Sequence, residues 1–284
     1  MQSLTSTFTL ENGVKIPVVG FGTWQTPDGD TAVNSVMWAL RAGYRHIDTA
    51  AIYGNERSVG AAIKASRVPR EELFVTSKLW NANRGYETTL KAFEQTMADL
   101  GLEYLDLYLI HWPANAKQFP NGRADELNLA TWQAMTELYK AGRIKAIGVS
   151  NFLPHHLEPL MKTEVKPMVN QIEFHPGYMQ AETVEYCRRH NILVEAWSPL
   201  GNGRLLADSA LGEIAARYGR STAQLVIRWV LQQGILPLPK SVTESRIIEN
   251  AQVFDFEISA QDMATITAMP AMAFSGLNPD TADF

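Results

Sequence analysis

Short apolar runs alternate with longer amphipathic segments along most of the chain. Eight such runs occur, at residues 18–22, 46–48, 73–78, 105–111, 146–150, 168–174, 193–198 and 235–240. Most of them are apolar throughout, without a regular apolar–polar alternation, as is typical of strands buried on both faces of a sheet. The pattern therefore predicts eight parallel strands.

The segments between the runs carry helix signals. In residues 88–101, large apolar side chains recur three or four positions apart, which places them on one helical face, and a glycine ends the pattern. Residues 221–234 begin with Ser221 and Gln224, which have the spacing of a capping box. Residues 259–269 begin with a serine and an aspartate at the same spacing. We expect a helix in each of these segments.

Strand–helix repetition of this kind is typical of a (β/α)8 TIM barrel, and we predict that residues 1–284 form a single domain of this class. Residues 8–19 form an expected β-hairpin around an Asn-Gly turn, which would close the bottom of the barrel. The last helix would be an addition. A doubly wound sheet is the alternative, but no strand is followed by G-x-G-x-x-G. The nearest match, residues 201–206, has Leu206 at the third glycine position.

Composition and charge narrow the class of protein. The chain has 284 residues, 46% hydrophobic and 19% charged, which suits a soluble globular protein with a large core. A net charge of −5 gives no broad basic surface, so we expect no nucleic-acid partner. The single cysteine, Cys187, excludes an intrachain disulfide framework, and we expect a buried structural thiol. The sequence shows no signal peptide and no membrane span, so we expect a cytoplasmic monomer without a membrane partner.

Titratable residues lie at or just beyond the ends of three successive predicted strands. The second run ends in Asp48, with Tyr53 just beyond it, the third ends in Lys78 and the fourth ends in His111. Each has an ordinary structural explanation when taken alone: an aspartate bonds turn amides, and a lysine at a strand end is usually solvated. In a TIM barrel, however, the carboxyl ends of the strands meet at one face, where catalytic residues lie.

These four residue types suit the reduction of a carbonyl group. Tyrosine has an ordinary pKa of about 10, and a nearby ammonium would favour the phenolate and lower that pKa. Asp48 would hold Lys78 by a salt bridge, and His111 would donate a hydrogen bond to the substrate oxygen. Tyr53 would then protonate the oxygen as hydride reaches the carbon.

Other chemistries lack their motifs. H-E-x-x-H and clustered carboxylate ligands are missing, so we expect no metal, and G-x-S-x-G is missing as well. We assign structural roles to the remaining histidines, which are His46, His155, His156, His175 and His190.

The eighth run offers a site for the phosphate of a hydride donor. Lys240 and Ser241 end this run, and a helix that starts near Thr243 carries Arg246. Phosphate commonly binds after the last strands of a barrel at a helix N-terminus. Guanidinium and ammonium groups suit the 2′-phosphate of NADP. A capped surface helix with exposed basic residues is the alternative.

Other strand ends supply polar and aromatic groups. Ser150, Asn151 and Gln171 could hold the nicotinamide carboxamide, and Trp197 could stack on the ring or simply fill the core. An apolar wall around a small substrate is expected from three tryptophans that follow the first, third and fourth strands, which are Trp24, Trp80 and Trp112.

Taken together, the motifs resemble the aldo-keto reductases along nearly the whole chain. The matching segments occur in order and are GFGTW, HIDTAAIYGNE, SKLW, DLYLIHWP, GVSNF, VNQIEFHP, AWSPL and PKSVTESRIIEN. The short connections are most similar to the bacterial 2,5-diketo-D-gluconate reductase-like branch, which includes enzymes acting on methylglyoxal and other small aldehydes.

The resemblance implies a (β/α)8 barrel that reduces small aldehydes and ketones with NADPH. It implies Asp48, Tyr53, Lys78 and His111 as the catalytic tetrad, and Tyr53, His111 and the three tryptophans as substrate contacts. The cofactor contacts that it implies are Ser150, Asn151, Gln171, Trp197, Ser198, Leu200, Gly201, Lys240, Ser241, Val242, Arg246, Glu249 and Asn250.

Some features leave the substrate and the role open. The loop at 201–207 and the segment at 273–284 are short compared with the larger animal members, so a long clamp over the cofactor is not expected. One alternative is an NADPH-binding barrel with a redox-sensing or regulatory role, although no added partner-binding segment is evident. Another is a barrel lyase that uses Lys78 as a Schiff-base lysine, which would leave Asp48 and Tyr53 without a task.

Overall fold

A barrel of parallel strands forms the centre of the computed structural model, which describes residues 3–284. The sheet has the strand order β10-β9-β8-β7-β6-β5-β4-β3, and the Gly22 amide of β3 donates to the Pro239 carbonyl next to β10, at 3.1 Å, which closes the ring. Its strands are β3 (Gly20–Gly22), β4 (His46–Asp48), β5 (Phe74–Leu79), β6 (Leu105–Ile110), β7 (Ile144–Ser150), β8 (Val169–Glu173), β9 (Leu193–Trp197) and β10 (Leu236–Pro237). Each of the eight predicted runs overlaps one of these strands, so the TIM-barrel prediction is confirmed.

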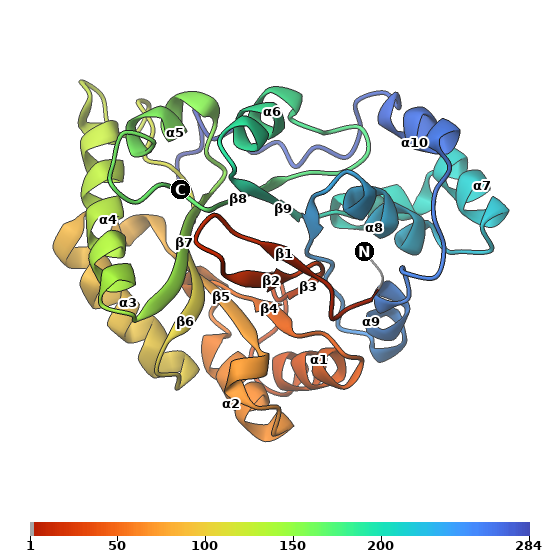
Figure 1. The fold of residues 1–284 in the computed structure, drawn as a ribbon, viewed down its shortest axis with the longest axis horizontal. Helices are drawn as coiled ribbons and strands as arrows, with labels where there is room; N and C mark the ends of the chain where they lie inside the picture. Colours follow the sequence, from red (N-terminus) through yellow and green to blue (C-terminus); the bar gives the residue numbers. More distant parts are fainter. Residues whose placement is uncertain (1–2) are drawn as a thin grey trace.

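Helices surround the ring of strands (Figure 1). They are α1 (Asp30–Arg41), α2 (Glu56–Ser66), α3 (Tyr86–Leu100), α4 (Arg123–Lys140), α5 (Pro154–Leu160), α6 (Ala181–Arg189), α7 (Ser209–Arg217), α8 (Thr222–Gln232), α9 (Glu244–Ala251) and α10 (Ala260–Thr267). Nearly every residue of the barrel strands is buried, so the strands expose few side chains to solvent on either face. This explains why the runs read as continuous apolar stretches.

The helix ends follow the predicted capping only in part. Ser221 and Gln224 form the reciprocal capping box at the start of α8. At α10, Ser259 accepts the Asp262 amide as expected. The Asp262 carboxylate, however, is bonded by Arg217 and by the Tyr218 hydroxyl, so the second half of that expected box is replaced by a contact between α10 and α7.

Two helices lie outside the simple strand–helix repeat within the described chain. The sequence predicted α10 as an addition, but it did not predict α7, which lies between β9 and α8. The Asp208 side chain caps α7 by accepting the Leu211 amide. Its nine residues follow a short 3-10 segment, Gly201–Ala207, so the apolar period is too brief to stand out in the sequence.

The predicted hairpin is present at the amino end of the barrel. Strands β1 (Thr7–Thr9) and β2 (Lys15–Pro17) pair in antiparallel fashion and lie across the middle of the ring in Figure 1. Ile16 of β2 is fully buried among barrel residues such as Leu107 and Leu236. The Asn12 side-chain amide donates to the Lys145 carbonyl at 2.9 Å. The hairpin therefore closes the end of the barrel opposite the carboxyl ends of the strands.

Two further expectations concern the chain as a whole. Cys187 is a buried free thiol on α6, and burial raises its pKa to about 11, which agrees with a structural role. Within residues 3–284, no helix combines the length and apolar character required for a membrane span.

Candidate active site

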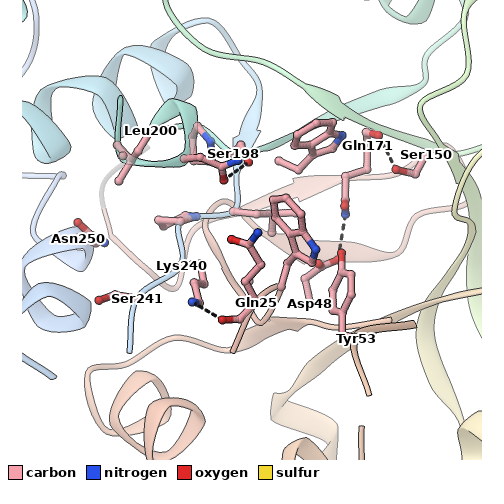
Figure 2. Close-up of a pocket in the computed structure, with 18 of the residues that line it drawn as sticks. Gln25, Asp48, Tyr53, Ser150, Gln171, Ser198, Leu200, Lys240, Ser241 and Asn250 are labelled. Atoms are coloured by element: carbon pink, nitrogen blue, oxygen red, sulfur yellow. Dashed lines mark hydrogen bonds between the residues drawn. The ribbon is translucent and has the colours of Figure 1, made fainter. Parts of the chain in front are cut away.

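The carboxyl ends of the strands open into one cavity of about 710 Å³. Figure 2 shows polar side chains from several strands pointing into it, with Tyr53 and Ser150 toward one end and Ser241 and Asn250 toward the other. The cavity is thus long, and residues far apart in the sequence line it because parallel strands end at the same face.

Lys78 lies behind the wall of the cavity and is fully buried. Its Nζ atom contacts Asp48 Oδ1 at 2.6 Å, the Thr49 carbonyl oxygen at 2.9 Å and the Tyr53 hydroxyl at 3.2 Å. Burial opposes the charge, but Asp48 and Tyr53 together raise the lysine pKa above its ordinary value. The ammonium is therefore charged, held in a fixed direction and directed at the tyrosine.

Tyr53 and Asp48 are the members of this group that line the cavity. Tyr53 ends a short 3-10 segment, Ala51–Tyr53, and Gly54 follows it in the left-handed region with φ 68°. Burial raises the pKa of Tyr53 and Asp48 adds to this rise, while Lys78 lowers it. The expected lowering by Lys78 is therefore present, but the net pKa of Tyr53 is raised, because burial of the phenolate and the charge of Asp48 together outweigh the effect of the ammonium.

His111 directly follows β6 and faces Tyr53, with 5.6 Å between the ring centroids. Burial, together with the charge of Lys78, lowers the His111 pKa well below its ordinary value. Its Nδ1 atom is buried and has no hydrogen-bond partner within residues 3–284. The imidazole is therefore neutral, and a proton on Nε2 is suited to donate to a substrate oxygen.

A second carboxyl group lies beneath the tetrad. The Gln171 Nε2 atom donates to Asp48 Oδ2 at 2.9 Å and to Glu195 Oε2 at 2.8 Å. Glu195 is fully buried in β9, and burial raises its pKa to about 8. Its role was not predicted from the sequence, although a glutamate inside a buried strand was the available signal. Its proton keeps a second negative charge away from Asp48.

The residues expected to hold a carboxamide lie next to the tetrad. Asn151 is buried with φ 64°, and its Nδ2 atom donates to the His111 carbonyl at 3.0 Å. The Trp197 indole N–H donates to Asn151 Oδ1 at 2.8 Å, and the Ser150 hydroxyl donates to the Gln171 carbonyl at 2.7 Å. These mutual hydrogen bonds fix the side chains before any ligand is present. Ser150, Asn151, Gln171 and Trp197 all line the cavity.

The opposite end of the cavity carries the cations. Lys240 Nζ donates to the Gln25 carbonyl at 2.9 Å, and burial lowers the Lys240 pKa. Arg246 is exposed on the first turn of α9, and Thr243 at the start of that helix makes no side-chain cap. Arg246 lines the cavity, and the start of its helix carries no side-chain cap, which is the kind of helix end at which phosphate binds. The other expected residues that line the cavity are Ser198, Leu200, Ser241, Glu249 and Asn250.

Two expected cofactor contacts lie outside the lining. Gly201 is buried behind it, close to Ala273 and Leu205. Val242 is 40% exposed and lies next to the lining residue Ser241. Their assignment stays a prediction from the resemblance.

Aromatic residues form the wall of the cavity near Tyr53. The expected Trp24, Trp80 and Trp112 all line it. Phe284 lines it as well, stacked on Trp80 with 5.7 Å between centroids and edge-on to Trp112 at 5.2 Å. The sequence did not predict Phe284, because its position depends on how the 273–284 segment folds back over the barrel.

A barrel in which a tyrosine hydroxyl, a buried charged lysine and a neutral histidine lie beside a long cavity with cations at its far end is typical of an oxidoreductase of carbonyl compounds. The aldo/keto reductase family model matches residues 18–270. The chain belongs to this family.

Characterised relatives match nearly the full chain. It is 52% identical to the glyoxal reductase of Bacillus subtilis over 279 residues, which cover 98% of each protein. It is 49% identical to the 9,11-endoperoxide prostaglandin H2 reductase of Trypanosoma cruzi over 276 residues, which cover 96% of this chain and 94% of that one. The crystal structure of an aldo-keto reductase from Bombyx mori in complex with NADP is 34% identical, with a TM-score of 0.84 and coverage of 94% and 92% of the two chains.

Proposed function

We propose that this aldo-keto reductase uses NADPH to reduce small uncharged aldehydes and ketones, and in particular dicarbonyl compounds such as methylglyoxal and glyoxal. The observation that carries the proposal is the Tyr53 hydroxyl, held 3.2 Å from the buried Lys78 ammonium at the aromatic end of the cavity. A proton donor beside a fixed positive charge suits the oxygen of a carbonyl group.

The residues that line the cavity fit the cofactor. Volumes of roughly 300–1,000 Å³ are usual for cofactor and small-molecule sites. Ser150, Asn151 and the Gln171 oxygen would hold the carboxamide, and Trp197 would lie against the ring. Arg246 and Lys240 would hold the phosphate at the other end. When bound there, NADPH supplies a hydride at the end of the cavity where Tyr53 lies.

The side chains of the tetrad divide the remaining work. His111 and Tyr53 would donate hydrogen bonds to the same substrate oxygen, which orients the carbonyl carbon toward the hydride donor. The Tyr53 proton moves to the oxygen as negative charge develops there, and Lys78 stabilises the phenolate that remains. Asp48 keeps Lys78 charged and in place.

Charge around the cavity favours uncharged substrates. Within the described chain, the basic side chains that line the cavity are Lys240 and Arg246, both at the phosphate end. The substrate end is lined by aromatic rings, which give a carboxylate no cationic partner. A glyoxal reductase is among the relatives, which supports the choice of small dicarbonyls.

The experiment is NADPH oxidation by the purified protein with methylglyoxal, 2,5-diketo-D-gluconate and an aromatic aldehyde. We expect turnover with methylglyoxal and the aromatic aldehyde, and kcat/KM at least tenfold lower for the anionic sugar acid. A preference for the sugar acid would contradict the assignment of uncharged substrates. NADPH binding without turnover of any carbonyl would favour the regulatory alternative.

A further inference from the structure

A chain of hydrogen bonds runs from the interior of the barrel to the Tyr53 hydroxyl. It begins at Glu195 in β9, whose Oε2 atom accepts the Gln171 side-chain amide at 2.8 Å. The same Gln171 nitrogen donates to Asp48 Oδ2 at 2.9 Å, and Asp48 Oδ1 accepts the Lys78 ammonium at 2.6 Å. The ammonium contacts the Tyr53 hydroxyl at 3.2 Å. Glu195 does not line the cavity, so it can act on a substrate only through these residues.

The surroundings of Glu195 fit a neutral carboxyl group. The side chain is fully buried, and its Oε1 atom has no hydrogen-bond partner within residues 3–284. An ionised carboxylate there would have a single donor for its two charged oxygens. It would also lie close to a second carboxylate, because one nitrogen of Gln171 bonds both Glu195 and Asp48. Burial and the charge of Asp48 accordingly raise the pKa of Glu195 to about 8.

Charged side chains act on Glu195 from two other strands of the described barrel. Asp48 in β4 opposes ionisation of Glu195, whereas Lys78 in β5 and the hydrogen bond from Gln171 in β8 favour it by less. Strand β10 places the apolar Leu236 beside Glu195. Because Lys78 is already paired with Asp48, it is not free to neutralise a second carboxylate. Loss of the Glu195 proton would therefore add a negative charge to the interior of the barrel.

We propose that Glu195 is a positioning residue for carbonyl reduction, which in its neutral form fixes the Gln171 amide and which slows turnover when it ionises. This role rests on the proton transfer from Tyr53 proposed above. As that proton leaves, negative charge develops on the tyrosine oxygen, and Lys78 stabilises it. An ionised Glu195 would oppose this charge, because its field is only weakly screened inside the barrel. A neutral Glu195 holds Gln171 in place without that effect.

Two substitutions of Glu195 separate its hydrogen bond from its charge. In Glu195→Gln, the side-chain oxygen can accept the Gln171 amide as Oε2 does, and the NH2 group takes the place of the unpartnered Oε1. This variant keeps the positioning contact and cannot ionise. Glu195→Leu also cannot ionise, but it offers Gln171 no acceptor. A fold that already places Leu236 beside this position should accept a second leucine.

The test is the pH dependence of kcat/KM for an aromatic aldehyde with saturating NADPH, measured from pH 6.5 to pH 9.5. We expect the wild-type value to fall roughly tenfold as Glu195 ionises. Glu195→Gln should stay within about threefold of the wild type at pH 6.5 and lose most of the alkaline fall. Glu195→Leu should be roughly three- to tenfold less active at pH 6.5, because Gln171 is held less firmly, and should also lack the alkaline fall.

Two other glutamates supply controls. Glu213→Gln, exposed on α7, should show the wild-type pH profile. Glu56 is a second buried glutamate, and burial raises its pKa to about 7, but its carboxylate accepts Ser77 and Thr96 hydroxyls and does not line the cavity. Glu56→Gln should therefore keep the alkaline fall.

An alkaline fall in Glu195→Gln as large as in the wild type would overturn the effect of the charge, and wild-type activity of Glu195→Leu at pH 6.5 would overturn the positioning role. Infrared difference spectra of Glu56→Gln give a measurement that leaves Glu195 unchanged. We expect the absorption of one protonated carboxyl group to disappear over the pH range in which kcat/KM falls; no such absorption at pH 6.5 would also refute the proposal. Full turnover in Tyr53→Phe would instead contradict the proposed proton donor.

Discussion

Tyr53 can release its proton to a substrate only if the phenolate left behind is stabilised. In the proposed reaction the Lys78 ammonium, 3.2 Å away, would supply that stabilisation, while burial keeps the hydroxyl protonated until the substrate arrives. Tyr53→Phe removes the proton and keeps the ring. We expect kcat with methylglyoxal to fall at least roughly 100-fold and the Kd for NADPH, measured by fluorescence quenching, to change little.

The control for this variant is Tyr86→Phe, because that exposed hydroxyl bonds Glu137 on the barrel surface and not the cavity. It should keep wild-type turnover. Full activity in Tyr53→Phe would show that another group protonates the oxygen.

Glu195 makes the stability of the fold depend on pH. Its pKa is about 8 in the folded protein, against an ordinary value of 4.5. Between these values the folded protein holds a proton that the unfolded chain has lost, so the free energy of unfolding falls as pH rises through this range. In Glu195→Gln that fall should be smaller, by on the order of a few kcal/mol between pH 5 and 8.

Urea denaturation of Glu195→Gln and the wild type at pH 5, 6.5 and 8 would measure this difference. Glu56 leaves a residual slope of the same sign, because burial raises its pKa to about 7. Glu11→Gln, on the exposed hairpin, is the control and should follow the wild type. Parallel pH profiles for Glu195→Gln and the wild type would mean that Glu195 is ionised in the folded protein.

For single residues, the sequence predicted some positions but not the pKa values or the hydrogen-bond partners. The positions of Asp48, Lys78 and His111 could be predicted, because parallel strands bring their own ends together. The net pKa of Tyr53 could not, since it depends on how much water the surrounding rings exclude. Glu195 was missed because its partner, Gln171, lies on the neighbouring strand, and sequence gives no hydrogen-bond geometry.

At the scale of elements, α9 combines an uncapped N-terminus with Arg246 on its first turn. A guanidinium bonded to the 2′-phosphate distinguishes NADPH from NADH, which lacks that group. Arg246→Ala should raise KM for NADPH about 10- to 100-fold and leave KM for NADH nearly unchanged. Steady-state kinetics with both cofactors would measure this. Arg189→Ala, exposed on α6, should change neither KM, and equal effects of Arg246→Ala on the two cofactors would contradict the phosphate site.

The 273–284 segment shapes the substrate end of the cavity through Phe284. Phe284→Ala removes the ring that stacks on Trp80 and widens this end. We expect kcat/KM for methylglyoxal to fall by up to about tenfold, while a bulky aromatic ketone loses less or gains. The ratio of the two values is the measurement. Phe274→Ala, whose ring stacks on Tyr178 outside the cavity lining, should leave the ratio unchanged. An unchanged ratio in Phe284→Ala would mean that the ring does not limit substrate size.

Elements with long apolar periods were predictable, and short or fold-dependent ones were not. The pattern in residues 88–101 predicted α3 to within two residues at its start. Helix α7 has nine residues and was missed, because a period of 3.6 repeats only twice in that length. The course of residues 273–284 depends on side chains from α5 and from the loop after β6, which no local pattern encodes.

For the whole molecule, closure of the barrel depends on small residues where the first and last strands meet. A Cβ atom on Gly20 would lie 2.5 Å from Leu238 Cδ2 and 2.6 Å from His46 Nδ1. Gly20→Ala should therefore destabilise the fold by about 1–3 kcal/mol through overpacking. Guanidinium denaturation would measure the loss.

Gly212 in α7 is the matched control. A Cβ atom there has its nearest neighbour, Thr222 Oγ1, at 3.9 Å. Gly212→Ala should stabilise the protein by up to about 1 kcal/mol, because alanine favours the helix more than glycine does. If Gly20→Ala left the free energy of unfolding unchanged, the barrel would be able to widen between β3 and β10 at no cost in stability.

The two hydrogen bonds that the Gln171 side-chain amide donates affect which chemical form of the cofactor the site accepts. Both hydrogens of Nε2 are directed to the carboxyl groups of Asp48 and Glu195, so the side chain cannot turn its nitrogen toward the cavity without losing its hydrogen bond to Asp48 Oδ2. Its oxygen is then the amide atom left to contact a bound cofactor, and an oxygen can accept a hydrogen bond from an amide but not from a carboxylate. The enzyme should therefore discriminate against deamidated cofactor, in which nicotinic acid replaces nicotinamide, because that acid would place a negative charge against an acceptor backed by a carboxylate.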